Sequence, residues 1–426
     1  MKVSVSRREL RISVNSFVIA SSCIVNTIYA VLTCGRGIRG AASLYLAAVY
    51  FLGIASEVIL NQGKIELRHV RHFCALELLL FGACVLTMLF AEAETTMTMG
   101  DYLFYCFFPP LFTLFEFDTE KVLRYGMYLS LISCLEVNAL LSDQAISWRF
   151  SQARLGTIYD LLPCIIMAMF HFAYYREKAA KFTKLCCLYY TYVLIRMLLV
   201  IVRGALLTLM AGLLVIYLNR PQGSRDALRA WSVKKKILLG FGAALAVLAV
   251  LNFDLVITWL YTALESAGIH IGVITKFHYY ISTGNITNNR EAYYRLAFRM
   301  FLKSPVWGSG VQTFYAYSPD GAAYPHNYIL QFLFEGGLLL ALPLTFVTLR
   351  ELYRLAAARY VSTDRMAFSA CVLLLSVVPG MFSINIWYNR TFWLAVMWGL
   401  TARKKDFRGR ERGACENRDL NLPPVT

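Results

Sequence analysis

Chemistry-bearing side chains are concentrated in residues 289–338, which read NREAYYRLAFRMFLKSPVWGSGVQTFYAYSPDGAAYPHNYILQFLFEGGL. Near the end of this stretch, His326 and Asn327 stand directly before an apolar run that carries Glu335. An unperturbed imidazole titrates at about pH 6.5 and accepts a proton at neutral pH, so His326 is a candidate general base. Taken alone, the same histidine also fits a structural hydrogen-bonding role. Glu335 is expected to help hold the run that follows His326, and the two glycines after it permit close helix packing.

Two arginines have the chemistry and the placement to bind an anion. A guanidinium group is permanently charged, and its fork of donors matches the geometry of a phosphate. Arg203 lies between two apolar segments, where an arginine is costly unless it is paired or faces a wet cavity. The alternative for Arg203 is a helix end whose side chain reaches the headgroup level. Arg290 begins an amphipathic segment, so it either binds an anion or belongs to a solvated face that contacts lipid headgroups.

The segment that Arg290 begins has the pattern of a helix. Charged residues recur at every fourth position of residues 289–304, as Glu291, Arg295, Arg299 and Lys303. This spacing places them on one helical face, with apolar residues elsewhere around the wheel. We expect an amphipathic helix that lies on the membrane surface or against a bundle, with Arg295 and Arg299 on its solvated side.

The elements that must position these residues are membrane spans. Hydrophobic residues make up 58% of the 426 residues, charged residues make up 16%, and the mean hydropathy is +0.53. Polar groups are too few to cover a water-facing surface, so the excess apolar surface must face lipid. Apolar runs of spanning length predict an all-α bundle of about twelve transmembrane helices. The runs fall near 12–33, 42–61, 73–91, 101–117, 123–141, 157–175, 185–201, 204–218, 237–260, 327–348, 366–384 and 389–402.

The basic residues orient this bundle. The net charge is +16, and the positive residues punctuate the apolar runs, as at Lys64, Arg68 and Arg71. The loops richest in lysine and arginine fall on one side of the predicted bundle, which is therefore cytoplasmic. We therefore predict that the chain has four parts and that both termini are cytoplasmic. Spans one to nine lie in 1–260, and an extracytoplasmic loop with the site motif covers 261–326. Spans ten to twelve lie in 327–403, and a basic tail covers 404–426.

The same distribution of residues argues against other classes of function. The basic residues do not form a patch with interleaved aromatics, so a nucleic-acid partner is not expected. The chain has 11 cysteines but no Cys-x-x-Cys pair, and most of the cysteines lie within apolar runs. We therefore expect no disulfide framework and no zinc site. The outer loop contains no cluster of aspartate and histidine, so we expect no metal and no cofactor.

Residues 289–338 resemble the O-antigen ligase and polymerase superfamily of bacterial surface-polysaccharide enzymes. In that family an arginine-led helix, a Pro-x-x-Gly-x-Gly turn and a His-Asn…Glu-x-Gly element follow one another in this order. The counterparts here are Arg290, the turn at Gly308 and Gly310, and the element at 326–337. Two weaker matches are Arg203-Gly204-Ala205, which lacks the usual preceding serine, and Arg154-Leu155-Gly156, which lacks the usual Pro-Asn that follows.

The resemblance implies a GT-C-like membrane glycosyltransferase in the bacterial cytoplasmic (inner) membrane. Its donor would be a glycan linked to undecaprenyl pyrophosphate, and its acceptor a glycan or lipid hydroxyl at the outer face. By this resemblance Arg203, Arg290 and Arg154 bind the pyrophosphate, and His326 deprotonates the acceptor with inversion at the anomeric carbon. Asn327, Glu335, Gly308 and Gly310 would support the site. Membrane lipids, and chain-length regulators or other polysaccharide-assembly proteins, are the expected partners.

Alternatives remain from the sequence. Nothing in these residues fixes the acceptor, and the polymerase is slightly favoured over a ligase to lipid A core or another acceptor. A polysaccharide flippase or transporter also has many spans and intramembrane charges, although it would concentrate them in a central cavity. A membrane-embedded structural protein is a third class. Aromatic residues near the motif either stack on sugars or form an interfacial belt: Tyr293, Tyr294, Trp307, Tyr315, Tyr317 and Tyr324.

Overall fold

The fold is all-helical over the part of the chain that the computed structural model describes. The described residues are 6–32, 41–131, 151–175, 186, 188–192, 203–219, 253–269, 272–284, 290–357, 360 and 362–402. The predicted basic tail at 404–426 lies outside them. No strand occurs within these ranges, in agreement with the predicted fold class.

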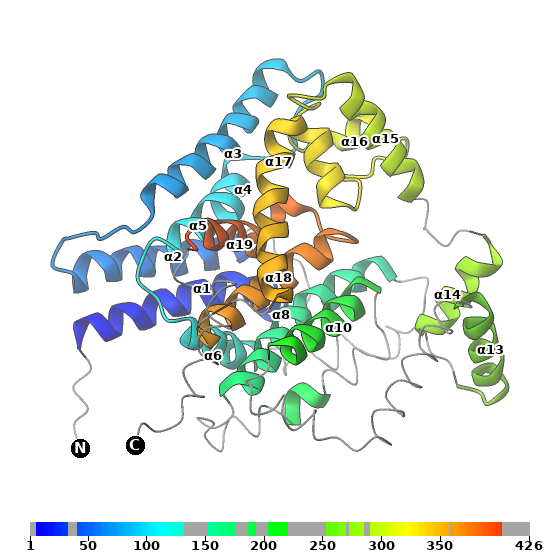
Figure 1. The fold of residues 1–426 in the computed structure, drawn as a ribbon, viewed down its shortest axis with the longest axis horizontal. Helices are drawn as coiled ribbons and strands as arrows, with labels where there is room; N and C mark the ends of the chain where they lie inside the picture. Colours follow the sequence, from blue (N-terminus) through cyan, green and yellow to red (C-terminus); the bar gives the residue numbers. More distant parts are fainter. Residues whose placement is uncertain are drawn as a thin grey trace, which may run out of the picture.

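The N-terminal half packs its helices around a core of aliphatic and aromatic side chains. Helix α1 packs against α2 and α6, and α6 packs against α8 (Figure 1). A buried ion pair joins two of these helices, since Arg11 contacts Glu57 at 3.4 Å. The elements of this half are α1 (Arg7–Leu32), α2 (Ala41–Leu60), α3 (Val70–Phe90), α4 (Met99–Asp101), η1 (Tyr102–Phe107), α5 (Phe108–Phe112), α6 (Thr119–Ser130), α8 (Ser151–Tyr175) and α10 (Arg203–Leu218).

The C-terminal half carries the predicted motif. Helices α15 and α16 lie together beside one end of α17, whereas α13 and α14 pack on each other and stand apart from the bundle (Figure 1). Helix α13 crosses the predicted loop boundary at residue 260. The elements are α13 (Phe253–Ser266), α14 (Gly272–Ser282), α15 (Arg290–Lys303), α16 (Phe314–Tyr317), α17 (Tyr328–Ala356), α18 (Thr363–Gly380), η6 (Ile386–Tyr388) and α19 (Arg390–Leu400).

Four described helices are long and apolar enough to cross a bilayer, which agrees with the predicted membrane character of the chain. They are Ser43–Leu60, Val70–Phe90, Tyr328–Ala356 and Thr363–Gly380, and shorter apolar helices cover Leu161–Tyr175 and Leu207–Leu218. Each of the four overlaps a predicted span. The count of about twelve stays a prediction. The runs at 185–201 and 237–260 lie mostly outside the described residues.

Candidate functional site

The site is built on a break in α17. Gly337 has φ 60° and ψ −153°, which interrupts the helix within a predicted span. The loop 304–310 fills the break with backbone hydrogen bonds in both directions. Leu338 N–H donates to the Pro305 carbonyl at 2.8 Å, and Ser309 N–H donates to the Phe334 carbonyl at 2.6 Å. Broken helices are tolerated at membrane depth because other groups satisfy the freed backbone, and this loop does so here.

Glycines make this close approach of loop and helix sterically feasible. Gly308 has φ +73°, and a Cβ there would stand 2.5 Å from the Glu335 carbonyl carbon. A Cβ on Gly337 would collide with the Val306 carbonyl oxygen. Gly310 has φ +112°, a region that residues with a side chain rarely adopt. The turn predicted at Gly308 and Gly310 is present, and its partner is the Glu-Gly-Gly element of α17.

Glu335 lies at the centre of a buried hydrogen-bond network. It is 1% exposed, and its carboxyl oxygen Oε1 accepts from Gln331 Nε2 at 3.1 Å and from the Gln312 backbone N–H at 3.2 Å. The Trp387 indole N–H donates to its other oxygen. Asn385 and Gln312 exchange two amide hydrogen bonds of 2.9 Å. Glu335 therefore ties α17 to the loop after Gly310 and to the segment between α18 and α19.

His326 occupies a strained position just before α17. Its φ of 58° is left-handed, which is uncommon for a residue with a side chain. The imidazole packs against Tyr324, with ring centroids 4.4 Å apart, and against Tyr293 at 5.9 Å. Its Nδ1 is buried and has no hydrogen-bond partner within the described residues. Asn327 then caps α17, because its side-chain oxygen accepts from the Ile329 and Leu330 N–H groups at 3.0 and 3.1 Å.

The electrostatics of His326 favour its neutral form. Burial, and then the positive charge of Arg290, lower the pKa of His326 to about 4, while Asp320 opposes the shift. Arg290 is the first residue of α15, so the start of this helix lies near enough to the histidine for the positive charge to act on it. The Asp320 carboxylate accepts hydrogen bonds from Ser318 Oγ at 2.6 Å and from the Tyr293 hydroxyl. Hydrogen bonds from Ser318 and Tyr293 hold the pKa of Asp320 below its usual value.

Helices α8 and α10 reach the same place from the other half of the chain. Gly204 faces Tyr159 of α8 so closely that a Cβ there would collide with the tyrosine hydroxyl. Phe382, which follows α18, lies 3.4 Å from the same position. Arg290 interacts electrostatically with Tyr159 as well as with His326. Arg203 directly precedes Gly204, so the start of α10 lies beside Tyr159, on which Arg290 also acts.

The predicted arginines are placed unequally. Arg290 lies within electrostatic reach of His326 and Tyr159, and Arg203 directly precedes Gly204, which packs against Tyr159. Arg154 lies in the first turn of α8, on the N-terminal side of Tyr159. The side chains of Arg203 and Arg154 are outside what the structure describes. Arg295 and Arg299 are exposed on α15, as the solvated-face interpretation predicted.

Several residues of the site were not predicted. Tyr159 stands in the place where the family pattern has its Pro-Asn pair, and Gln312, Asn385 and Trp387 carry no local signal. Asp320 lies in a Ser-Pro-Asp-Gly sequence that is typical of a turn, so the sequence could have predicted its position in a loop. Within the described residues, no three histidine, cysteine, aspartate or glutamate side chains come close enough to hold a metal ion together.

Comparison with known proteins relates part of the chain to a family. A family model described as O-antigen ligase matches residues 188–345. The matched stretch contains Arg203, Arg290, His326 and Glu335, whereas Arg154 and helices α1 to α8 precede it. The chain matches no curated protein.

Proposed function

We propose that the chain is an inner-membrane glycosyltransferase of the O-antigen ligase and polymerase superfamily that uses an undecaprenyl pyrophosphate-linked glycan, and the match of residues 188–345 supports this proposal. The family is one of membrane enzymes that act on lipid-linked glycans. The single observation that carries the finer proposal is that Arg290 lies near enough to His326 to act on its charge. The same arginine acts on Tyr159, which packs against Gly204 at the start of α10.

Arg290 and Arg203 are proposed to bind the pyrophosphate of the donor, with Arg154 as a third candidate. The leaving group carries negative charge that grows as its bond to the sugar breaks, and guanidinium groups stabilise such charge through forked, charge-assisted hydrogen bonds. The arginine at the start of α15 also gains from the position, because a helix N-terminus favours anions. The burial around His326 strengthens these interactions by excluding water.

His326 is proposed to act as the general base. Its neutral imidazole takes the proton of the acceptor hydroxyl, whose oxygen forms a bond to the anomeric carbon of the donor sugar. The bond from that carbon to the phosphate oxygen breaks, and its electron pair leaves with the pyrophosphate. Attack from the face opposite the leaving group inverts the anomeric configuration. The strained backbone and the buried, unpaired Nδ1 of His326 are features that functional residues often have.

The wider proposal keeps the topology predicted from the sequence. The site lies at the outer face, residues 261–326 are extracytoplasmic, and both termini are cytoplasmic. The acceptor is a second lipid-linked glycan in a polymerase, which is the favoured form, or a lipid A core or other acceptor in a ligase. Chain-length regulators or other polysaccharide-assembly proteins are candidate partners. Neither metal nor cofactor is needed by the proposed step.

The test is a transfer assay with purified protein and an undecaprenyl pyrophosphate-linked glycan. The variant His326→Asn keeps a residue that tolerates a positive φ, so backbone strain changes little. We expect transfer to fall roughly 100- to 10,000-fold, as for the loss of a general base. The thermal unfolding temperature should be unchanged.

The matched control is His69→Asn. His69 also has a positive φ, of 59°, and it precedes α3 far from Arg290 in the sequence. Transfer by this variant should equal that of the unmodified protein. Full transfer by His326→Asn would remove the general-base role, and absence of any transfer by the unmodified protein on all lipid-linked donors would favour a flippase.

A further inference from the structure

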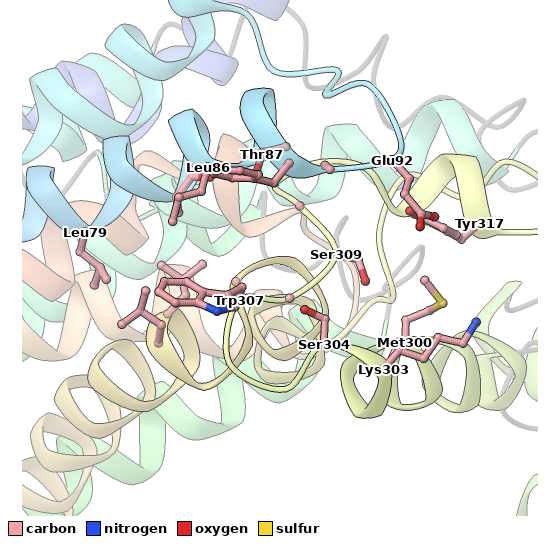
Figure 2. Close-up of a pocket in the computed structure, with 18 residues that line it drawn as sticks. Leu79, Leu86, Thr87, Glu92, Met300, Lys303, Ser304, Trp307, Ser309 and Tyr317 are labelled. Carbon is pink, nitrogen blue, oxygen red and sulfur yellow. The ribbon is translucent and has the colours of Figure 1, made fainter.

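A cavity lies away from His326, between two predicted spans. It has a volume of about 690 Å³ and is lined by α3, by α17 and by the loop that fills the break in α17 (Figure 2). One end is apolar, with Leu79 and Leu86 of α3 facing Trp307. Glu92 and Lys303 mark the other end, and Ser309 lies between the two ends (Figure 2). The lining of the cavity therefore changes from apolar at one end to charged at the other.

This gradient follows the direction of the membrane. Helix α3 is a candidate span over Val70–Phe90, and Leu79 lies near its middle, whereas Glu92 lies just beyond its end. The apolar end of the cavity is thus deep in the bilayer and the polar end is at the surface. A membrane lipid has the same arrangement, with its hydrocarbon chain below its headgroup.

The cavity lies beside exposed apolar surface. Leu89 of α3 and Leu339 and Leu342 of α17 are 66%, 46% and 61% exposed, so both helices present apolar surface that faces lipid in a bilayer. Leu339 also lines the cavity. The cavity therefore adjoins the apolar surface of α17 that faces lipid in a bilayer.

The cavity is separate from the surroundings of His326 and Arg290. Helix α15 has 14 residues, which corresponds to about 20 Å, with Arg290 at its first position and Lys303 at its last. Between these ends, Ala297 packs with Phe314 and Phe334 in a small core in which all three are fully buried. A lipid whose pyrophosphate lies on Arg290 would have to run around that core, along the length of α15, to place its chain in this cavity.

We propose that the cavity binds the isoprenyl chain of a lipid-linked acceptor, with Lys303 pairing its phosphate. This inference rests on the proposed function, which requires an acceptor in addition to the donor. Lys303 is the sole cation among the described residues that line the cavity, and Ser304 and Ser309 add hydroxyl donors beside it. Glu92 on the opposite wall confines an anion to the Lys303 side.

One chain is what the space accommodates. A volume of about 690 Å³ is in the range of sites for a single small molecule, so it holds part of one chain and not the several chains of lipid A. The acceptor hydroxyl then reaches His326 from the far end of the saccharide, across the outer surface of α15. An isoprenyl-linked acceptor is the substrate of a polymerase, so the cavity favours that form of the proposed function.

The test is photo-crosslinking with a diazirine-bearing isoprenyl monophosphate, on the full chain in nanodiscs of phosphatidylcholine. We expect mass spectrometry to find label on the 79–87 segment of α3 and on residues 304–309. Unlabelled isoprenyl monophosphate should compete, whereas isoprenol and phosphatidic acid should not. Lys303→Gln should lower labelling about tenfold, the effect of losing one charge-assisted hydrogen bond, and Lys303→Arg should retain it.

Matched variants test the shape of the cavity. Ala83→Trp places a large side chain on a lining position, whereas Leu78→Trp, at a position that is 78% exposed on the same helix, does not. The first should abolish labelling and raise the KM for the acceptor at an unchanged KM for the donor; the second should do neither. Arg299→Gln, one turn from Lys303 and outside the cavity lining, should label normally.

Three results overturn the inference. They are absence of label on the cavity walls, equal competition by phosphatidic acid, which would make the cavity a site for bulk phospholipid, and equal labelling of Ala83→Trp and Leu78→Trp. Because labelling requires no glycan transfer, these results are distinct from a failure of the proposed function. Label confined to residues beside Arg290 would leave the donor site standing and remove the acceptor cavity.

Discussion

Glu335 and His326 lie close together in sequence near the start of α17, and the hydrogen bonding of their side chains differs. Both carboxyl oxygens of Glu335 accept hydrogen bonds, from Gln331, Gln312 and Trp387. His326 has a buried ring nitrogen with no partner in the described part of the chain, and a left-handed backbone. A saturated polar group supports a fold, whereas an unsatisfied one is available for a ligand.

The comparison separates residues that hold the site from the residue that is proposed to react. Removing a supporting residue should reduce stability and activity together. Removing the reactive residue should reduce activity alone. Variants at the two kinds of position therefore measure whether the division is real.

The largest loss of stability is expected for Glu335→Ala. It leaves the buried Gln312 N–H and the Trp387 indole N–H without an acceptor, and it removes one of the two acceptors of Gln331 Nε2. Each buried donor without a partner costs about 1–3 kcal/mol, so the free energy of unfolding should fall by roughly 3 kcal/mol or more. Thermal unfolding in detergent measures this loss. Glu335→Gln, which keeps an oxygen for part of the network, should lose less.

The control for Glu335→Ala is Glu94→Ala, since Glu94 is an exposed acidic residue beyond the end of α3. Its unfolding temperature should not change. If Glu335→Ala unfolded at the normal temperature but transferred no glycan, Glu335 would belong with the reacting residues, and the comparison with His326 would fail.

Local patterns in the sequence predicted much of this region. The four-residue spacing of charges predicted α15, and the apolar runs predicted α3, α17 and α18. Gly308 and Gly310 predicted a turn. What the sequence did not yield is the long-range pairing. The partners of Glu335 come from three separate segments, and Asn385 and Trp387 fall beside an ordinary apolar run. The break at Gly337 depends on carbonyls of Pro305 and Val306, which no periodicity reveals.

A smaller loss of stability is expected for Gly337→Ala. The residue has a positive φ and no space for a Cβ beside Val306, so strain of about 1–3 kcal/mol should lower the unfolding temperature. Gly82→Ala is the matched control, because Gly82 lies in α3 with no atom within 4 Å of an added Cβ. That variant should be as stable as the unmodified protein or more stable, since alanine favours a helix.

Unchanged stability in Gly337→Ala would mean that the loop 304–310 does not depend on the break in α17. The glycan transfer rate of the variant should fall with its folded fraction, because the loop positions α15 and therefore Arg290. A full loss of transfer at full stability would instead show that the break itself contacts substrate.

The smallest effect, and the sharpest test of the His326 environment, is a shift in pH dependence. Burial and then Arg290 lower the pKa of His326 to about 4, so the base is unprotonated above that pH. Transfer measured as kcat/KM, which reports the free enzyme, should lose activity on the acid side near pH 4. In kcat, which reports the substrate complex, the loss should begin at higher pH, because the bound pyrophosphate offsets the charge of Arg290.

Arg290→Met removes that charge, so the pKa of His326 should rise towards its ordinary value and the acid limb of kcat/KM should move to higher pH. Arg290→Lys should keep the limb in place, and Arg295→Met, on the exposed face of α15, should leave both the limb and the rate unchanged. Asp320 opposes Arg290, so Asp320→Asn should move the limb in the other direction, to lower pH. Opposite shifts of the acid limb in Arg290→Met and Asp320→Asn would identify the titrating group as His326, because these two charged groups act on its pKa with opposite signs. An acid limb that neither variant moves would assign the proton transfer to a different residue.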